Sequence, residues 1–132
     1  MGILRHHGIQ PSAQRVAVAG YILYTHDHPS ADQVWATVRA RFPLLSRATV
    51  YNTLHRFAEK GLIRELVLTP GRIVFDANVG PHHHFIDENT GRIYDIPWPA
   101  LKVGNVRRLR RFKVRDYHVV LRGTRAGRRA SQ

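Results

Sequence analysis

The chain contains no cysteine. This absence excludes disulfides, thiolate nucleophiles, iron–sulfur clusters and zinc sites built from cysteine, and it is typical of a reducing compartment, so we expect a cytoplasmic protein. No apolar run approaches the roughly 18 residues of a membrane span, and the N-terminus has no secretory pattern. Acidic residues are also few: nine Asp and Glu stand against 21 Lys and Arg, a net charge of +12. This balance indicates a polyanion partner, and the lack of an amphipathic basic helix favours nucleic acid over membrane.

With 132 residues, of which 43% are hydrophobic, the chain can form one domain or two very small ones. The basic charge is concentrated near the end. From Lys102 onward there are eleven Lys and Arg and a single acid, Asp116. Residues 124–132 lack apolar anchors and are predicted to form a disordered basic tail.

The first half of the chain carries three helix signals in succession. The predicted helices cover residues 13–24, 31–42 and 47–60, and their N-caps are Ser12, Ser30 and Ser46. Gln33 completes a capping box with Ser30, and Gly61 stands where a helix-terminating glycine is expected. The segments 62–68 and 73–75 are rich in β-forming residues and flank a turn at 69–72, which predicts a hairpin. Three helices followed by a hairpin indicate a winged helix-turn-helix.

The third predicted helix has two faces. Val50, Leu54 and Phe57 form an apolar back, whereas the front carries side chains able to read base edges in a major groove. An ordinary solvated face is the alternative, and the overall charge favours DNA. The predicted DNA contacts are Arg15, Ser46, Arg47, Thr49, Tyr51, Asn52 and His55.

A run of three histidines follows the hairpin. In a strand over 82–87, His82 and His84 project from one face and His83 from the other, and a second strand over 92–96 brings Asp95 alongside. Such a nitrogen and oxygen set suits Fe²⁺, Mn²⁺ or Zn²⁺, and the oxygen share favours the first two. The alternative is a histidine run without a ligand role.

Together these motifs resemble the ferric uptake regulator (Fur) superfamily over about residues 4–123. The matching segments are Gly8, Gln14-Arg15, His28 to Asp32, Ser46 to Leu54, Gly61 to Ile63, Phe75-Asp76, His82 to His84, Ile93, Asp95 and Tyr117 to Gly123. The resemblance implies an α+β fold, with a winged helix-turn-helix domain over 1–77, a hinge at 76–81 and a small α/β dimerisation domain over 82–123. It also implies a homodimeric, metal-dependent transcriptional regulator, not an enzyme, that acts as a repressor on a palindromic double-stranded DNA operator.

The resemblance further implies a regulatory Fe²⁺ or Mn²⁺ site, which would also accept Zn²⁺ in vitro, with the ligands His28, Asp76, His82, His84 and Asp95. Aspartate at both acidic positions resembles the peroxide-sensing (PerR-like) branch, where peroxide oxidises a ligand, here His28 or His82, and DNA is released. The iron- or haem-responsive Irr-like branch is the alternative, because it shares the triple histidine followed by an apolar residue and often lacks cysteine.

Three departures from the family are visible. The cysteine pairs that hold structural zinc are absent, and the first pair would fall at Asp87 and Thr90, so no structural zinc is expected. The segment 97–111 is predicted to be only a weak helix. A second metal site would use His83 and His118, but the acid expected near Lys102 is missing.

Two other function classes stay open from the sequence. One is a winged-helix protein that binds DNA without metal and uses its histidines structurally. The other is a small metalloenzyme built on Asp76, His82, His84 and Asp95, against which no additional nucleophile or general base lies near these residues.

Overall fold

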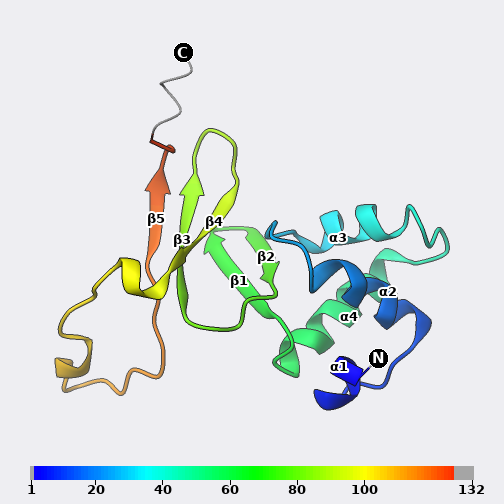
Figure 1. Cartoon of the computed structure of the whole chain (residues 1–132), viewed down its shortest axis with the longest axis horizontal. Coiled ribbons are helices and arrows are strands. Elements are labelled where there is room, and N and C mark those ends of the chain that lie inside the picture. The colour runs from blue at the N-terminus through cyan, green and yellow to red at the C-terminus, as the bar shows by residue number, and fades with distance from the viewer. Residues whose placement is uncertain (1, 127–132) are drawn as a thin grey trace. The chain divides into compact units, whose positions relative to one another are not determined.

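The computed structural model describes residues 2–126 and divides the chain into two compact units, Met1–Val79 and Gly80–Gln132 (Figure 1). The first unit holds four helices and a hairpin, and the second is built on a three-stranded sheet. The fold is therefore α+β. Within residues 2–126, no helix combines the length and apolar character needed to cross a bilayer.

The helices of the first unit are α1 (Gly2–His6), α2 (Ala13–Ile22), α3 (Ala31–Val38) and α4 (Arg47–Glu59). The three predicted N-caps are confirmed, because Ser12, Ser30 and Ser46 each accept a hydrogen bond from the backbone N–H three residues later. The capping box of Ser30 and Gln33 is also present. Gly61 has φ 76°, the left-handed conformation that ends α4 without the steric penalty of a Cβ.

The core of this unit lies between α2, α3 and α4. Val18, Val34, Leu54 and Phe57 are fully buried there, and each contributes about 1.5–3 kcal/mol of burial free energy. The short helix α1 adds Leu4 to the same cluster. That helix was not predicted, because five residues are too few to show a helical period.

The structure corrects the predicted end of the second helix. α3 ends at Val38, not at Phe42, and the N–H groups of both Arg41 and Phe42 donate to the Val38 carbonyl. The chain thus leaves the helix through a tight turn before Pro43. Pro43 limits the helix to residues before Phe42–Pro43, but the turn after Val38 ends it earlier.

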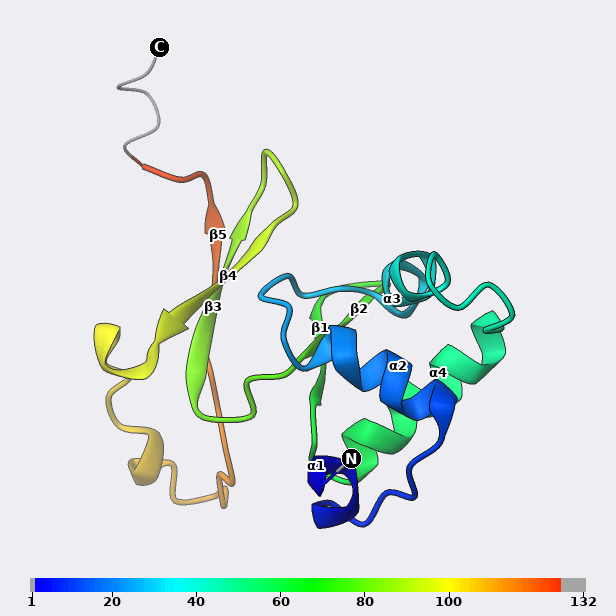
Figure 2. The ribbon, with the colours of Figure 1, turned by 45° about the vertical axis from the view of Figure 1, so that its right-hand side comes forward.

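The hairpin follows α4, as Figure 2 shows, and consists of β1 (Arg64–Thr69) and β2 (Arg72–Asp76). The predicted hairpin is confirmed, and Gly71 supplies the left-handed residue of its turn (φ 76°). The N–H of Phe75 donates to the Pro29 carbonyl at 2.9 Å. This bond holds the segment before α3 against the last residues of β2.

The second unit contains β3 (His82–Asp87), β4 (Ile93–Pro97) and β5 (Val120–Gly123), in the spatial order β4-β3-β5. β3 pairs antiparallel with β4 and parallel with β5. The histidine strand and its partner therefore form as predicted, whereas the last strand is shorter than the 117–123 segment that carried the resemblance.

The predicted helix over 97–111 does not form. Its place is taken by two short 3₁₀ turns, η1 (Trp98–Ala100) and η2 (Val106–Arg108), joined by irregular chain. Pro99 disfavours the helical conformation at Trp98, and Gly104 lowers helix propensity in the middle of the segment. Arg107, Arg110 and Arg111, three and four residues apart, would also repel each other on the helix surface. Of the predicted tail, residues 127–132 lie outside the described part of the chain.

Candidate metal centre and nucleic-acid interface

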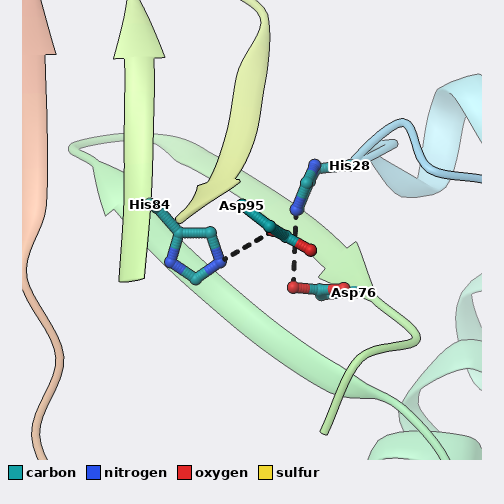
Figure 3. Close-up of side chains that lie close together, drawn as sticks. All are labelled: His28, Asp76, His84 and Asp95. Atoms are coloured by element: carbon teal, nitrogen blue, oxygen red, sulfur yellow. Dashed lines mark ion pairs between the residues drawn. The ribbon is translucent and has the colours of Figure 1, made fainter. Parts of the chain in front are cut away.

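The first unit contains a buried pair of His28 and Asp76. The His28 Nε2 atom lies 3.4 Å from Asp76 Oδ2, and the two side chains are 4% and 7% exposed (Figure 3). The hydrogen bond between Pro29 and Phe75 positions the pair, because each of its members is a chain neighbour of one partner. The other Asp76 oxygen, Oδ1, accepts the N–H of Asn78 at 2.9 Å.

The second unit gathers His82, His84 and Asp95. The ladder between β3 and β4 places Asp95 directly opposite His84, and His82 lies two residues away on the same face. The Nε2 atoms of His82 and His84 lie 3.5 and 3.7 Å from the same oxygen, Asp95 Oδ1. Both imidazoles are buried, whereas the carboxylate is partly exposed. Figure 3 draws the His84–Asp95 pair.

The tautomer of His82 indicates what this arrangement can hold. The His82 Nδ1 atom is 2.7 Å from the Gly80 carbonyl, which can only accept, so Nδ1 carries the hydrogen. In the neutral ring, the Nε2 lone pair then faces the Asp95 carboxylate, and two acceptors stay together only with a cation or a proton between them. A ligating histidine usually donates its second N–H to a backbone carbonyl in this way. The two imidazoles and the carboxylate therefore fit a divalent cation.

The same chemistry describes the pair in the first unit. His28, Asp76, His84 and Asp95 each offer one nitrogen or oxygen atom suitable for a metal ion. Imidazole and carboxylate together suit Fe²⁺, Mn²⁺ and Zn²⁺. Within the second unit, His82 offers a further imidazole beside His84, with the ring centroids 4.6 Å apart.

The two residues of the predicted second site have different neighbours. The His83 ring is 1% exposed and stacks on Trp98, with centroids 4.4 Å apart, and its Nδ1 atom accepts the N–H of Val119 at 2.8 Å. The exposed His118 lies edge-on to His84 at 5.3 Å, on the opposite face of β3. The structure thus places His118 beside His84.

The predicted DNA-contacting residues lie mainly on α4. Arg47, Tyr51, Asn52 and His55 are exposed, opposite the buried Val50, Leu54 and Phe57. The hydroxyl of Ser46 caps the helix and donates to the Thr49 hydroxyl at 2.9 Å. On α2, the Arg15 guanidinium donates to the Gln10 carbonyl at 2.8 Å.

Two side chains that the sequence did not predict, Asp32 and Trp35, contact this front. Asp32 of α3 lies 3.3 Å from the Arg47 Nε atom and accepts the Tyr51 hydroxyl at 3.4 Å, both through Oδ1. The Trp35 ring contacts two guanidinium groups, those of Arg39 at 4.3 Å and Arg47 at 4.9 Å from its ring centre. No short-range motif signals the contacts of Asp32 and Trp35 with α4, because they join different helices, whereas Arg39 is the C-cap of the same helix as Trp35.

A winged helix-turn-helix followed by a small sheet that bears histidine and aspartate defines a recognisable class of α+β protein. The model of the ferric uptake regulator family matches residues 6–122. The peroxide-responsive repressor PerR of Staphylococcus epidermidis is 37% identical over 98 residues, which are 74% of this chain and 65% of that protein. The match thus spans slightly less than two thirds of this relative.

Solved structures show the same fold at lower identity. The ferric uptake regulator from Francisella tularensis, solved with iron, gives a TM-score of 0.77 at 21% identity and covers 92% of this chain and 96% of that one. The Campylobacter jejuni peroxide stress regulator gives 0.72 at 24% identity and covers 96% of both chains. The protein belongs to the ferric uptake regulator family, whose members are transcriptional regulators and not enzymes.

Proposed function

We propose that the protein is a metal-dependent DNA-binding repressor whose regulatory ion, Fe²⁺ or Mn²⁺, is held by His28, Asp76, His82, His84 and Asp95. The observation that carries the proposal is the pair of buried imidazoles on β3 that face one oxygen of Asp95. A buried lone pair beside a carboxylate is unfavourable unless a cation or a proton lies between them, and a divalent cation meets this need with the two imidazoles and the carboxylate as its ligands. Family membership supports the same assignment.

The distribution of these ligands gives the proposal its mechanism. His28 and Asp76 belong to the unit that carries α4, and the other three ligands belong to the unit built on the sheet. Ligands drawn from both units restrain how α4 is presented to DNA. In a homodimer, this restraint selects a fixed spacing of two half-sites, so a palindromic operator is expected. Metal and DNA then favour the same arrangement, with a coupling of about 1–3 kcal/mol.

We propose peroxide as the signal, and the PerR relative supports this choice. Ferrous iron, when bound, supplies the redox chemistry by which peroxide oxidises a neighbouring imidazole. His28 and His82 are the ligands proposed to be oxidised. Oxidation of either ring removes a nitrogen donor, which lowers metal affinity and releases DNA.

The experiment compares the full chain with two single variants on a duplex selected from a random library in the presence of Mn²⁺. Chelation of Mn²⁺ is expected to weaken binding of the unchanged protein by about 5- to 150-fold. His28→Ala removes a proposed ligand and should bind as weakly with Mn²⁺ as without it. His26→Ala, an exposed histidine two residues earlier, is the matched control and should keep the full response.

A second pair of variants tests the other unit in the same assay. Asp95→Asn should lose the response to Mn²⁺, whereas Asp116→Asn, at a carboxylate that is 80% exposed, should retain it. Equal affinity of the unchanged protein with Mn²⁺ and with chelator would refute the proposal and would favour the metal-free winged-helix alternative.

A further inference from the structure

The second unit, not the one with α4, carries most of the positive charge. It holds twelve Lys and Arg against four acids, whereas the first unit holds nine against five. Much of this excess lies between β4 and β5, in a segment that we call the basic loop (residues 102–115). The basic loop contains no acid, and its seven cations are Lys102, Arg107, Arg108, Arg110, Arg111, Lys113 and Arg115.

These cations are exposed and largely unneutralised. Within residues 2–126, only Arg115 of the seven forms an ion pair, with the neighbouring Asp116 at 3.3 Å. The apolar side chains between them do not join a core either, since Phe112 is 68% and Leu109 is 49% exposed. Like charges at this density repel one another, so the segment has a favourable interaction to gain from an anion.

The sheet presents the basic loop at one end. The connection that contains the basic loop leaves β4 after Pro97, opposite His82, and returns to β5 at Val120, opposite His84. The rings of Trp98 and Tyr117 lie 5.0 Å apart and bring the two ends of the excursion together. The cations are therefore held on a closed loop and not on a free terminus.

We propose that the basic loop is a second DNA-binding surface, which contacts the phosphate backbone of the duplex independently of base reading by α4. Five of the six cations from Arg107 to Arg115 are arginine, whose planar fork binds phosphate oxygens in a bidentate manner. Contacts of this kind add affinity and fix position without reading sequence.

The choice of duplex DNA rests on the proposed function, because α4 would bring the tethered loop to DNA at high local concentration. An anionic membrane is the competing partner. Peripheral membrane binding usually uses an amphipathic helix, whereas the only helical element in the basic loop is the three-residue turn η2.

The test measures the dissociation constant for an arbitrary duplex between 50 and 200 mM salt. The variant Arg110→Gln/Arg111→Gln/Lys113→Gln removes three proposed phosphate contacts. The slope of log Kd against log salt should then decrease by about 2–3, since each contact contributes about 0.9. Between 50 and 200 mM salt, the factor by which affinity falls should therefore be roughly 40 times smaller for the variant than for the unchanged protein. Arg110→Lys/Arg111→Lys keeps the charge and should retain the slope within about one unit.

The matched control is a second triple variant, which removes three positive charges at the other end of the same sheet. Arg92, Arg122 and Arg125 lie at or near the end where β3 reaches Asp87, and Arg92→Gln/Arg122→Gln/Arg125→Gln should change the slope by less than about one unit. Equal slopes for the two triple variants would overturn the proposal, because net charge alone would then explain the effect.

The response to Mn²⁺ separates this proposal from the proposed function. The basic-loop variant should keep metal-stimulated binding to the selected duplex, so failure of either proposal leaves the other testable. Vesicles of phosphatidylserine and phosphatidylcholine supply the second arm. A variant that lost vesicle binding but kept the salt slope on DNA would refute the DNA surface and favour a membrane.

Discussion

Substitution of Asp32 tests whether this residue positions Arg47 and Tyr51 on the exposed front of α4. Its Oδ1 atom is the shared partner of Arg47 and Tyr51, at 3.3 and 3.4 Å. The Arg47 and Asp32 side chains are 60% and 57% exposed, so the pair adds less than about 1 kcal/mol to folding. Asp32→Ala should therefore leave the unfolding transition nearly unchanged. The effect is expected in DNA recognition instead.

The expected loss of DNA specificity follows from the conformational freedom that the Arg47 side chain regains when the Asp32 carboxylate is removed. A released arginine side chain has up to about 2 kcal/mol of rotamer entropy to lose again on binding, and a bidentate base contact provides about 1–3 kcal/mol of discrimination. Asp32→Ala should therefore reduce the preference for the selected duplex over a scrambled one by ~5- to 30-fold, or about 1–2 kcal/mol. Non-specific binding should not weaken, because a negative charge near the phosphates is removed.

Fluorescence anisotropy with both duplexes measures this ratio directly. Asp116→Ala removes one exposed carboxylate from the other unit and is the control for charge. If Asp32→Ala leaves the ratio unchanged, Asp32 does not position the front. If Asp116→Ala lowers the ratio equally, the effect comes from net charge.

Two further predictions concern the core and the signal. Leu54→Ala, at a fully buried position of α4, should lower the free energy of unfolding in a urea titration by about 2–5 kcal/mol. Val67→Ala, at a side chain that is 61% exposed, is the control and should change this free energy by less than about 0.5 kcal/mol. Protein loaded with Fe²⁺ without oxygen and then treated with dilute peroxide should gain the mass of one oxygen atom, mapped by peptide mass spectrometry to His28 or His82. An unmodified chain that still released DNA in response to iron or haem would contradict peroxide sensing and favour the Irr-like alternative.

The sequence predicted those parts of the fold that local chemistry determines. Ser12, Ser30 and Ser46 reveal their helices because a cap and its partner are three residues apart. The pairing of His84 with Asp95 was also accessible, since alternation and one short turn determine which residues face each other.

Elements that depend on tertiary packing or on short turns were not predictable in the same way. The helix α1 depends on burial of Leu4, and the end of α3 depends on a turn after Val38. The contacts of Asp32 join residues 15 and 19 positions apart on separate helices. The predicted helix over 97–111 does not form because repulsion among its arginines, the restriction of Trp98 by Pro99 and the low helix propensity of Gly104 outweigh a weak apolar pattern.

The placement of the two tryptophans gives each unit its own optical reporter. Trp35 contacts the guanidinium of Arg47 at 4.9 Å, and Trp98 stacks on His83 beside the start of the basic loop. Because the chain contains two tryptophans, one in each unit, a single Trp→Phe replacement leaves a fluorophore that reports on one unit alone. Emission recorded from the two single-tryptophan proteins would then resolve in time which unit engages a duplex first.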